Sequence, residues 1–339
     1  MSVVLSFLVV VILVITLFLL GPREKTRLWW QGNPAHDGPA TARSGLSPAI
    51  NLSELAAQLQ QSESEIPNII PGAEKLISFA NPALPAKTAC SVLYIHGFSA
   101  CRQEISPVPE MVASSLKANF HATRLTGHGT SAQQLGEARP DDWIRDVIEA
   151  WNVATQLGDK VIIVATSTGA TLATWMAQQP EVQAKLASLV LFAPNYRPNH
   201  KAIRLFLWPW ARCWIPLITG PDYGVASTRE EEARYWTAPY PVKVLFGVVG
   251  LAEAVYRSNV GSVKTPTLFI YADEDKTVYS SFTGKVMSRW GAAIVERLKE
   301  PAEPGSTNHV IAGDIFRPQS NERLVREVLG FIRNSDENS

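Results

Sequence analysis

Residues 161–169, VIIVATSTG, constrain the fold more than any other stretch of the chain. The run from Val161 to Ala165 is apolar and rich in β-branched residues, which is typical of a strand buried on both faces of a parallel sheet. A helical pattern follows Ser167 and Gly169. The stretch therefore predicts a strand, a sharp turn and a helix, with one serine at the apex beside backbone N–H groups that can stabilise an anion.

Two interpretations of Ser167 remain open at this point. Serine is a favoured N-cap, so the hydroxyl would serve only to start the helix. Alternatively, positions 165, 167 and 169 match the small-x-Ser-x-Gly pattern of a nucleophile elbow, with alanine in place of the first glycine. The remainder of the chain has to decide between a cap and a nucleophile.

The strand and helix pattern recurs along the chain and predicts an α/β fold with a mostly parallel sheet and helices on both faces. An edge strand is expected at 74–79, and buried strands at 91–95, 120–125, 186–193, 267–271 and 293–298. Helices are expected at 52–59, 104–118 and 321–334. A further helix is expected to begin at Asp141, and another to end at about Trp290. Ligands of such a sheet bind at the carboxyl edge of the strands.

Candidate site residues follow these strands, in the order serine, acid and histidine, which is one known order of a catalytic triad. A hydroxyl is a poor nucleophile until a base takes its proton, and His309, in the loop after the last strand, is the candidate base. The acid lies among residues 273–275. Asp275 is favoured, because Asp-x-x-Val puts the acid in the turn and Val278 at the start of a helix.

Composition excludes several classes of function. The 339 residues carry no net charge, so nothing favours nucleic-acid binding. The three cysteines have no CxxC spacing and predict neither a disulfide framework nor a zinc site. No cofactor and no metal is expected. Aspartate would be needed at position 167 for a dehalogenase.

The N-terminal run at 3–20 is apolar and just long enough, with its flanks, to span a bilayer. A secretory signal is the alternative, but the run has no preceding lysine or arginine and no A-x-A site after it. These features favour an uncleaved anchor at 1–22 that contacts the lipid bilayer through residues 3–20. Basic residues at 23–27 then predict a membrane protein whose catalytic domain is cytoplasmic.

The predicted organisation continues with a tether and lead-in at 23–72, a first part of the core at 73–194, an inserted helical cap at 195–262 and a second part of the core at 263–339. The cap is rich in aromatic residues. If these line a pocket rather than pack on the core, they favour a small-molecule substrate with an apolar acyl group.

Residues 75–334 resemble the alpha/beta-hydrolase superfamily, and especially its carboxylesterase, monoacylglycerol lipase and serine aminopeptidase-like branch. The resemblance is carried by HGF at 96–98, RLTGHG at 124–129, DW at 142–143, ATSTG at 165–169, DKTV at 275–278 and NH at 308–309. It implies Ser167 as nucleophile, His309 as general base and Asp275 as its orienter. The backbone N–H groups of Phe98 and Thr168 are then the oxyanion hole. Thr166, under the elbow, departs from the residues usual in the family.

Three functional hypotheses follow. The first is a membrane-anchored serine hydrolase that cleaves carboxylic esters through an acyl-enzyme on Ser167. The second is an aminopeptidase, which needs an acid to hold the substrate ammonium, with Glu230, Glu231 and Glu232 as candidates. The third is a non-catalytic binding protein that keeps the fold.

Overall fold

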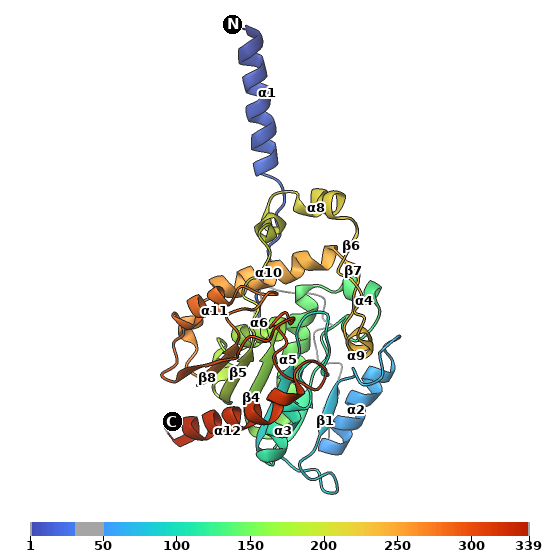
Figure 1. The fold of residues 1–339 in the computed structure, drawn as a ribbon, viewed down its shortest axis with the longest axis vertical. Helices are drawn as coiled ribbons and strands as arrows, with labels where there is room; N and C mark the ends of the chain where they lie inside the picture. The colour runs from blue at the N-terminus through green and yellow to red at the C-terminus, as the bar shows by residue number, and fades with distance from the viewer. Residues whose placement is uncertain (1, 31–50, 338–339) are drawn as a thin grey trace.

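A seven-stranded sheet lies at the centre of the protein, whose computed structural model describes residues 2–30 and 51–337 (Figure 1). The strand order is β1-β3-β2-β4-β5-β8-β9, and every neighbouring pair is parallel except β1 and β3. The strands are β1 (Leu76–Ser78), β2 (Thr88–Ile95), β3 (Asn119–Ala122), β4 (Gly158–Thr166), β5 (Leu186–Phe192), β8 (Thr267–Tyr271) and β9 (Val295–Lys299).

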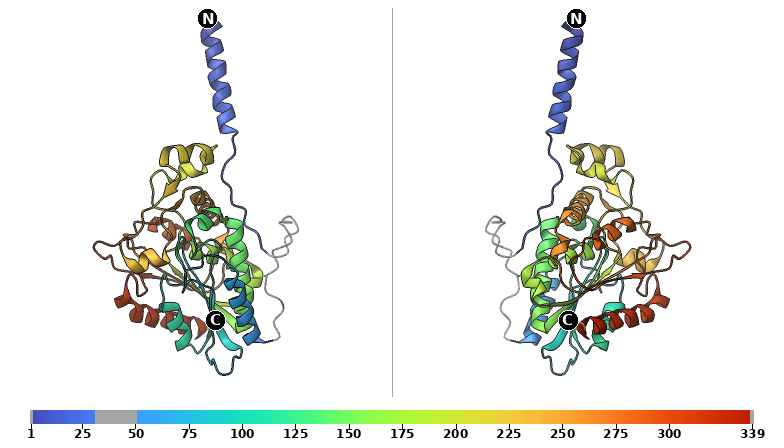
Figure 2. Two further views of the ribbon diagram at one scale, coloured as in Figure 1. Left: turned by 90° about the vertical axis from the view of Figure 1, so that its right-hand side faces the viewer. Right: turned by 90° about the vertical axis from the view of Figure 1, so that its left-hand side faces the viewer.

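Helices cover both faces of this sheet, and side chains alternate between the two faces along each strand. In β2, Val92 and Tyr94 pack on one side, against α3 (Val108–Ser115) and α12 (Asn321–Glu337). Leu93 and Ile95 pack on the other side. The helices of that side are α5 (Pro140–Leu157), α6 (Ser167–Met176), α10 (Lys243–Arg257) and α11 (Ser280–Met287). Figure 2 shows α12 and α5 on opposite sides of the sheet.

The predicted strands and helices of the core are present with small shifts of their ends. The helix expected at 104–118 begins only at Val108. Pro107 explains the delay, because Ser106, the residue that precedes it, is driven away from helical backbone angles. Residues 101–107 therefore form a loop. The helix expected at 52–59 is α2 (Leu52–Ser64), and Asn51 caps it by accepting a hydrogen bond from the Glu54 N–H.

The region 195–262 interrupts the alternation of strands and helices, as expected. It contains η1 (Ile203–Leu207), α8 (Ala211–Thr219), β6 (Asp222–Tyr223), α9 (Glu230–Tyr235), β7 (Tyr240–Pro241), α10 and η2 (Val260–Ser262). Helix α10 packs on α6 as part of the main core, whereas α8 lies far from the sheet (Figure 1). The short helices α4 (Ala132–Glu137) and α7 (Pro180–Gln183) and the turn η3 (Pro318–Ser320) complete the elements. The division into core and cap stays a prediction.

The N-terminal helix α1 (Ser2–Leu19) projects away from the rest of the protein (Figures 1 and 2). No helix among the described residues has both the length and the apolar character that crossing a membrane requires. The 18 residues of α1 are about 27 Å long, less than the roughly 30 Å of a bilayer core. The predicted anchor at 1–22 is therefore wrong. The bilayer contact through residues 3–20 and the membrane localisation with a cytoplasmic catalytic domain are wrong with it. Residues 31–50 of the predicted tether lie outside the described residues.

The close approach of α6 to β2 predicts a large effect of one methyl group. A Cβ atom at Gly169 would lie 2.3 Å from the Ile95 carbonyl oxygen and 2.4 Å from that of His96. Because both atoms belong to the backbone, Gly169→Ala is expected to lower the free energy of unfolding by about 1–3 kcal/mol. Urea denaturation measures this change.

Gly330→Ala is the matched control, because Gly330 is also helical but a Cβ there meets nothing within 4 Å. This variant should be neutral or gain up to about 1 kcal/mol. Equal effects of the two substitutions would contradict the packing argument.

Candidate active site

Ser167 lies at the junction of β4 and α6, at the carboxyl edge of the sheet. Its backbone φ is +51°, a left-handed value that costs free energy for a residue with a side chain. The strand ends at Thr166 and the helix begins at once, so the chain has no room for an ordinary turn. This conformation directs the hydroxyl out of the sheet. The residue is buried, with 6% of its surface exposed.

Asp275, His309 and Ser167 form a continuous chain of hydrogen bonds. The Nδ1 atom of His309 lies 2.7 Å from Asp275 Oδ2, and its Nε2 atom lies 2.9 Å from Ser167 Oγ. Since a carboxylate only accepts, Nδ1 carries the proton and Nε2 is free to accept one from the serine. The three residues predicted as a triad are thus together in space, although 142 positions separate Ser167 from His309.

Asp275 is the one of the three candidate acids that contacts His309. Its second oxygen, Oδ1, accepts hydrogen bonds from the backbone N–H groups of Thr277 (2.7 Å) and Val278 (2.9 Å). This is the turn expected from the Asp-x-x-Val spacing. Asp273 instead forms ion pairs with Arg297 and Lys299 at the surface. The carboxylate of Asp275 is therefore held on both sides.

The surroundings of His309 favour its protonated form. Burial alone lowers the pKa of the imidazole, but the negative charge and hydrogen bond of Asp275 raise it, and the charge of Glu104 adds to this. The net result is a pKa above the ordinary value of 6.5. A base of this kind is strong, but it is neutral only when the pH exceeds that raised value.

His96 orients the peptide that contains the Phe98 N–H. Its Nε2 accepts a hydrogen bond from the Leu125 N–H (3.0 Å), so Nδ1 carries the proton and donates it to the Gly97 carbonyl (2.8 Å). In a trans peptide the carbonyl and the next N–H point in opposite directions. The Phe98 N–H therefore points away from His96. Burial lowers the pKa of His96 to about 4, which keeps the ring neutral.

Thr168, the other predicted oxyanion donor, is the second residue of α6. The first N–H groups of a helix have no acceptor within the helix, so the Thr168 N–H is available at the site. Asn195, just after β5, fixes this turn from the opposite side. Its backbone N–H donates to the Ser167 carbonyl (3.1 Å) and its side chain donates to Thr168 Oγ1 (3.3 Å).

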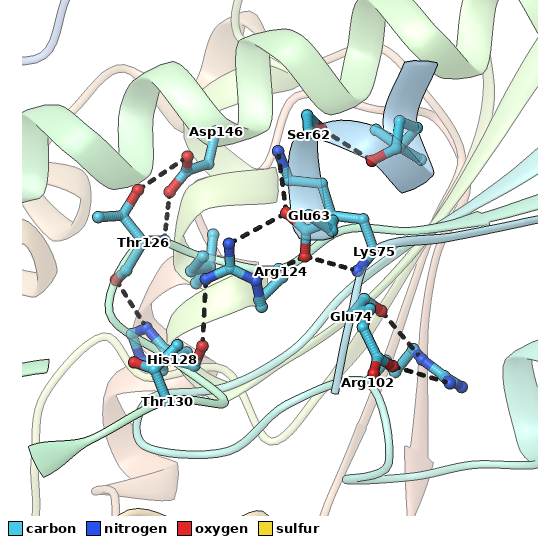
Figure 3. Close-up of polar contacts among 12 residues, drawn as sticks. Ser62, Glu63, Glu74, Lys75, Arg102, Arg124, Thr126, His128, Thr130 and Asp146 are labelled. Atoms are coloured by element: carbon cyan, nitrogen blue, oxygen red, sulfur yellow. Dashed lines mark hydrogen bonds and ion pairs between the residues drawn. The ribbon is translucent and has the colours of Figure 1, made fainter. Parts of the chain in front are cut away.

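A buried ion pair between Arg124 and Glu63 holds the loop at 124–129, whose polar contacts Figure 3 shows. Arg124 donates to both carboxylate oxygens of Glu63, at 2.7 and 3.0 Å, and to the His128 carbonyl at 3.2 Å. Asp146 accepts from the backbone and the hydroxyl of Thr126. These contacts fix the segment whose Leu125 N–H sets the tautomer of His96.

Aromatic rings surround Phe98. Its ring centroid lies 5.1 Å from that of Tyr240, 5.5 Å from His128 and 6.1 Å from Trp143. The tryptophans of the region 195–262 do not join this cluster: Trp208 and Trp210 are exposed, and the others pack elsewhere. Sequence reasoning therefore missed Tyr240, since one tyrosine among many cap aromatics gives no signal of its own.

A cleft of about 1050 Å³ lies outside this site, between residues 24–29, α4, the start of α5 and α10. None of the three triad residues lines it, so the site is defined by its chemistry and not by the size of a cavity. Within the described part of the chain, no group of three or more metal-ligating side chains is close enough to hold an ion. The three cysteines are free thiols.

The sheet order, the helices on both faces and the strained serine between β4 and α6 define an alpha/beta-hydrolase fold. One solved structure of this fold comes from work on two metagenome-derived lipolytic enzymes, LipS and LipT. It has 21% identity and a TM-score of 0.62, and it covers 78% of this chain and 99% of its own. The structure of a soluble variant of monoglyceride lipase from Saccharomyces cerevisiae has 13% identity and a TM-score of 0.56, over 77% of this chain and 91% of its own.

A family model described as serine aminopeptidase, S33, matches residues 87–299, and the chain belongs to this family. A thermostable monoacylglycerol lipase from Bacillus sp. (strain H-257) is 28% identical over 105 residues. This stretch covers 30% of the chain and 41% of the lipase, so the chain matches less than half of that relative's length. These comparisons support the esterase and lipase branch to which the sequence motifs point.

The buried pair between Arg124 and Glu63 predicts a pH-dependent contribution to stability. Arg124→Met leaves a buried carboxylate without its main partner and should lower the free energy of unfolding at pH 7 by about 3–5 kcal/mol. Burial alone raises the pKa of Glu63. The hydrogen bonds and the charge of Arg124 outweigh burial, so that the pKa of Glu63 lies below 4.5. A carboxyl group whose pKa is lower in the folded than in the unfolded protein stabilises the fold at pH values above its unfolded pKa. This stabilisation is lost as the pH falls through the folded pKa. The loss should therefore shrink as the pH falls towards 4.

Lys87→Met is the control for this measurement, because Lys87 pairs with Asp159 at the exposed surface. Such a pair contributes about 0–1 kcal/mol, and denaturant titrations at several pH values separate the two cases. If both variants lose the same amount, the buried pair has no special role.

Proposed function

We propose that this protein is a serine hydrolase of carboxylic esters that acts through an acyl-enzyme on Ser167. The observation that carries the proposal is the chain of hydrogen bonds from Asp275 through His309 to the hydroxyl of a strained serine. If Ser167 only capped the helix, its hydroxyl would not need a hydrogen bond to a histidine. The interpretation of Ser167 as a helix cap therefore explains less.

The chemistry follows from the positions of the donors and acceptors. His309 Nε2 takes the proton of Ser167 while Oγ attacks the ester carbonyl. The N–H groups of Phe98 and Thr168 stabilise the negative charge that forms on the carbonyl oxygen. His309 then gives its proton to the departing alcohol. Water, deprotonated by the same imidazole, hydrolyses the acyl-enzyme and restores the serine.

The substrate class that fits best is an ester with an apolar acyl group. The rings of Phe98 and Tyr240 are only partly buried and pack edge to face, and Phe98 also carries the proposed oxyanion N–H, so the apolar surface next to the site favours hydrocarbon over charge. The related proteins are described as monoacylglycerol lipases and lipolytic enzymes, in agreement with this class.

Peptidase activity, suggested by the family description, is the second candidate. An aminopeptidase needs an acid that holds the substrate ammonium. Glu230 and Glu231 are exposed on α9, and Glu232 accepts a hydrogen bond from Ser227. None of the three contacts a residue of the triad among the interactions of the described residues, so we favour the ester.

Ser167→Ala should reduce turnover of short and medium acyl esters by at least about 10⁴-fold, because no other group replaces the nucleophile. Labelling by a fluorophosphonate should disappear in the same variant. Ser188→Ala is the matched control, since Ser188 is also buried on a sheet strand and its hydroxyl has no partner among the described residues. Full turnover by Ser167→Ala, or no labelling of the wild type, would contradict the mechanism.

The acyl-length series with the wild type also separates the substrate classes. Medium chains should exceed acetyl esters in kcat/KM, and an aminoacyl amide should be a poor substrate. A preference for the amide would favour the peptidase.

Asp275→Asn should lower kcat by about 10⁴-fold, because the amide stabilises the wrong tautomer of His309. Asp273→Asn should retain activity within about threefold, since its partners are at the surface. In the wild type, kcat/KM should fall below a pKa that lies above 6.5, as His309 takes a proton. Equal effects of the two asparagine variants would contradict the assignment of the acid.

A further inference from the structure

Glu104 is a buried carboxyl group for which the proposed mechanism has no use. It lies in the loop before α3 and is 2% exposed. Its Oε2 accepts hydrogen bonds from the Gly97 N–H at 2.6 Å and from the Tyr94 hydroxyl at 3.3 Å. A carboxyl group is seldom buried without a charged partner unless its hydrogen bonds compensate for the loss of water.

The Glu104 carboxyl lies directly behind the serine and the predicted oxyanion loop. A Cβ atom at Gly97 would lie 2.6 Å from Glu104 Oε1 and 3.0 Å from Ser167 Cβ, so Gly97 is packed between them. Tyr94, the second donor to Glu104, has its hydroxyl 3.2 Å from Thr166 Oγ1. Glu104 therefore contacts the loop on one side and, through Tyr94, the end of β4 on the other.

The same segment also supports the loop of His309. A Cβ atom at Gly313 would lie 2.7 Å from Ile105 Cα and 2.9 Å from the Glu104 carbonyl oxygen. The Asp314 N–H donates to the Ser106 carbonyl at 2.9 Å. The loop that contains Glu104 thus contacts both the predicted oxyanion loop and the loop that follows His309.

The charged and titratable groups that face Glu104 are few among the described residues. They are Tyr94 on β2, His309 in the loop after β9 and Cys101 in the same loop as Glu104. Burial raises the pKa of Glu104 to about 7, against the opposing effects of the Gly97 N–H, His309 and Tyr94. In turn, the negative charge of Glu104 contributes to the raised pKa of His309.

We infer that Glu104 is a positioning residue: its carboxylate accepts the hydrogen bond of the Gly97 N–H and so holds the His96–Gly97 peptide, and with it the direction of the Phe98 N–H. The inference rests on the proposed function. The His96 contact and the Glu104 contact fix the two successive peptides of Gly97, one at its carbonyl and one at its N–H. With both peptides fixed, the Phe98 N–H keeps one direction throughout the reaction.

Two substitutions separate the hydrogen bond of Glu104 from its charge. Glu104→Gln keeps the size and an acceptor oxygen but removes the charge. Glu104→Ala removes the acceptor as well and leaves the Gly97 N–H buried without a partner. Glu110→Gln is the matched control, because Glu110 is a nearby, partly buried carboxyl on α3 that bonds to Ser106 and not to Gly97.

The experiment measures kcat and KM with the acyl ester preferred by the wild type. Glu104→Gln should keep kcat within about threefold, because its amide oxygen can still accept from the Gly97 N–H. Glu104→Ala should lose about 10- to 100-fold in kcat with little change in KM, since an oxyanion donor acts mainly in the transition state. Glu110→Gln should match the wild type.

Two results would overturn the inference. A loss of kcat in Glu104→Gln as large as that in Glu104→Ala would mean that the charge of Glu104, and not its hydrogen bond, is required. A proportional rise of KM in Glu104→Ala, with kcat unchanged, would mean that the hydrogen bond does not serve the transition state. If Glu104→Ala does not fold, Glu104→Met, which fills the same space without an acceptor oxygen, takes its place. Turnover by Ser167→Ala would instead refute the proposed function, so the two failures are distinguishable.

Discussion

The direct packing of α6 onto the end of β2 is the constraint on which the candidate site depends. At Gly169 the helix is so close to the carbonyls of Ile95 and His96 that no side chain fits. Gly97, on the facing loop, has the same restriction beside Ser167. Because both positions lack a Cβ atom, the start of a helix and the proposed oxyanion loop come within reach of one small substrate group. A site of this geometry needs both glycines for reasons of space, independently of their backbone angles.

This close approach buries polar backbone and charged side chains, and each needs a partner. His96 satisfies two backbone groups with its two nitrogens, and Asn195 satisfies two groups of the elbow. Arg124 and Glu63, which are also buried, neutralise one another. A buried ion pair of this kind is weak evidence for added stability, because desolvation offsets the attraction. Its effect here is geometric, since it fixes the loop that sets the tautomer of His96.

The features that sequence predicted well depend on short stretches of chain. The buried strand before Ser167 and the Asp-x-x-Val turn at Asp275 are each encoded within ten residues, and both are present. The anchor prediction failed because the apolar run was counted with its flanks, whereas the helix ends at Leu19. Glu104 was assigned to a helix, because periodicity cannot show that Pro107 delays the helix start or that Gly97, seven residues earlier, is the partner of Glu104.

Thr166 departs from the family pattern, and its surroundings give a physical reason. The residue is 1% exposed directly under the elbow, where a hydroxyl without a partner would be costly. The Tyr94 hydroxyl provides that partner, and it also contacts Glu104. Thr166, Tyr94 and Glu104 thus form one network that ends at the Gly97 N–H, and buried networks of this kind are favourable only when every member is satisfied. An apolar residue at position 166 would leave the Tyr94 hydroxyl with Glu104 alone. The unusual threonine and the buried glutamate are therefore best understood as one structural unit behind the serine.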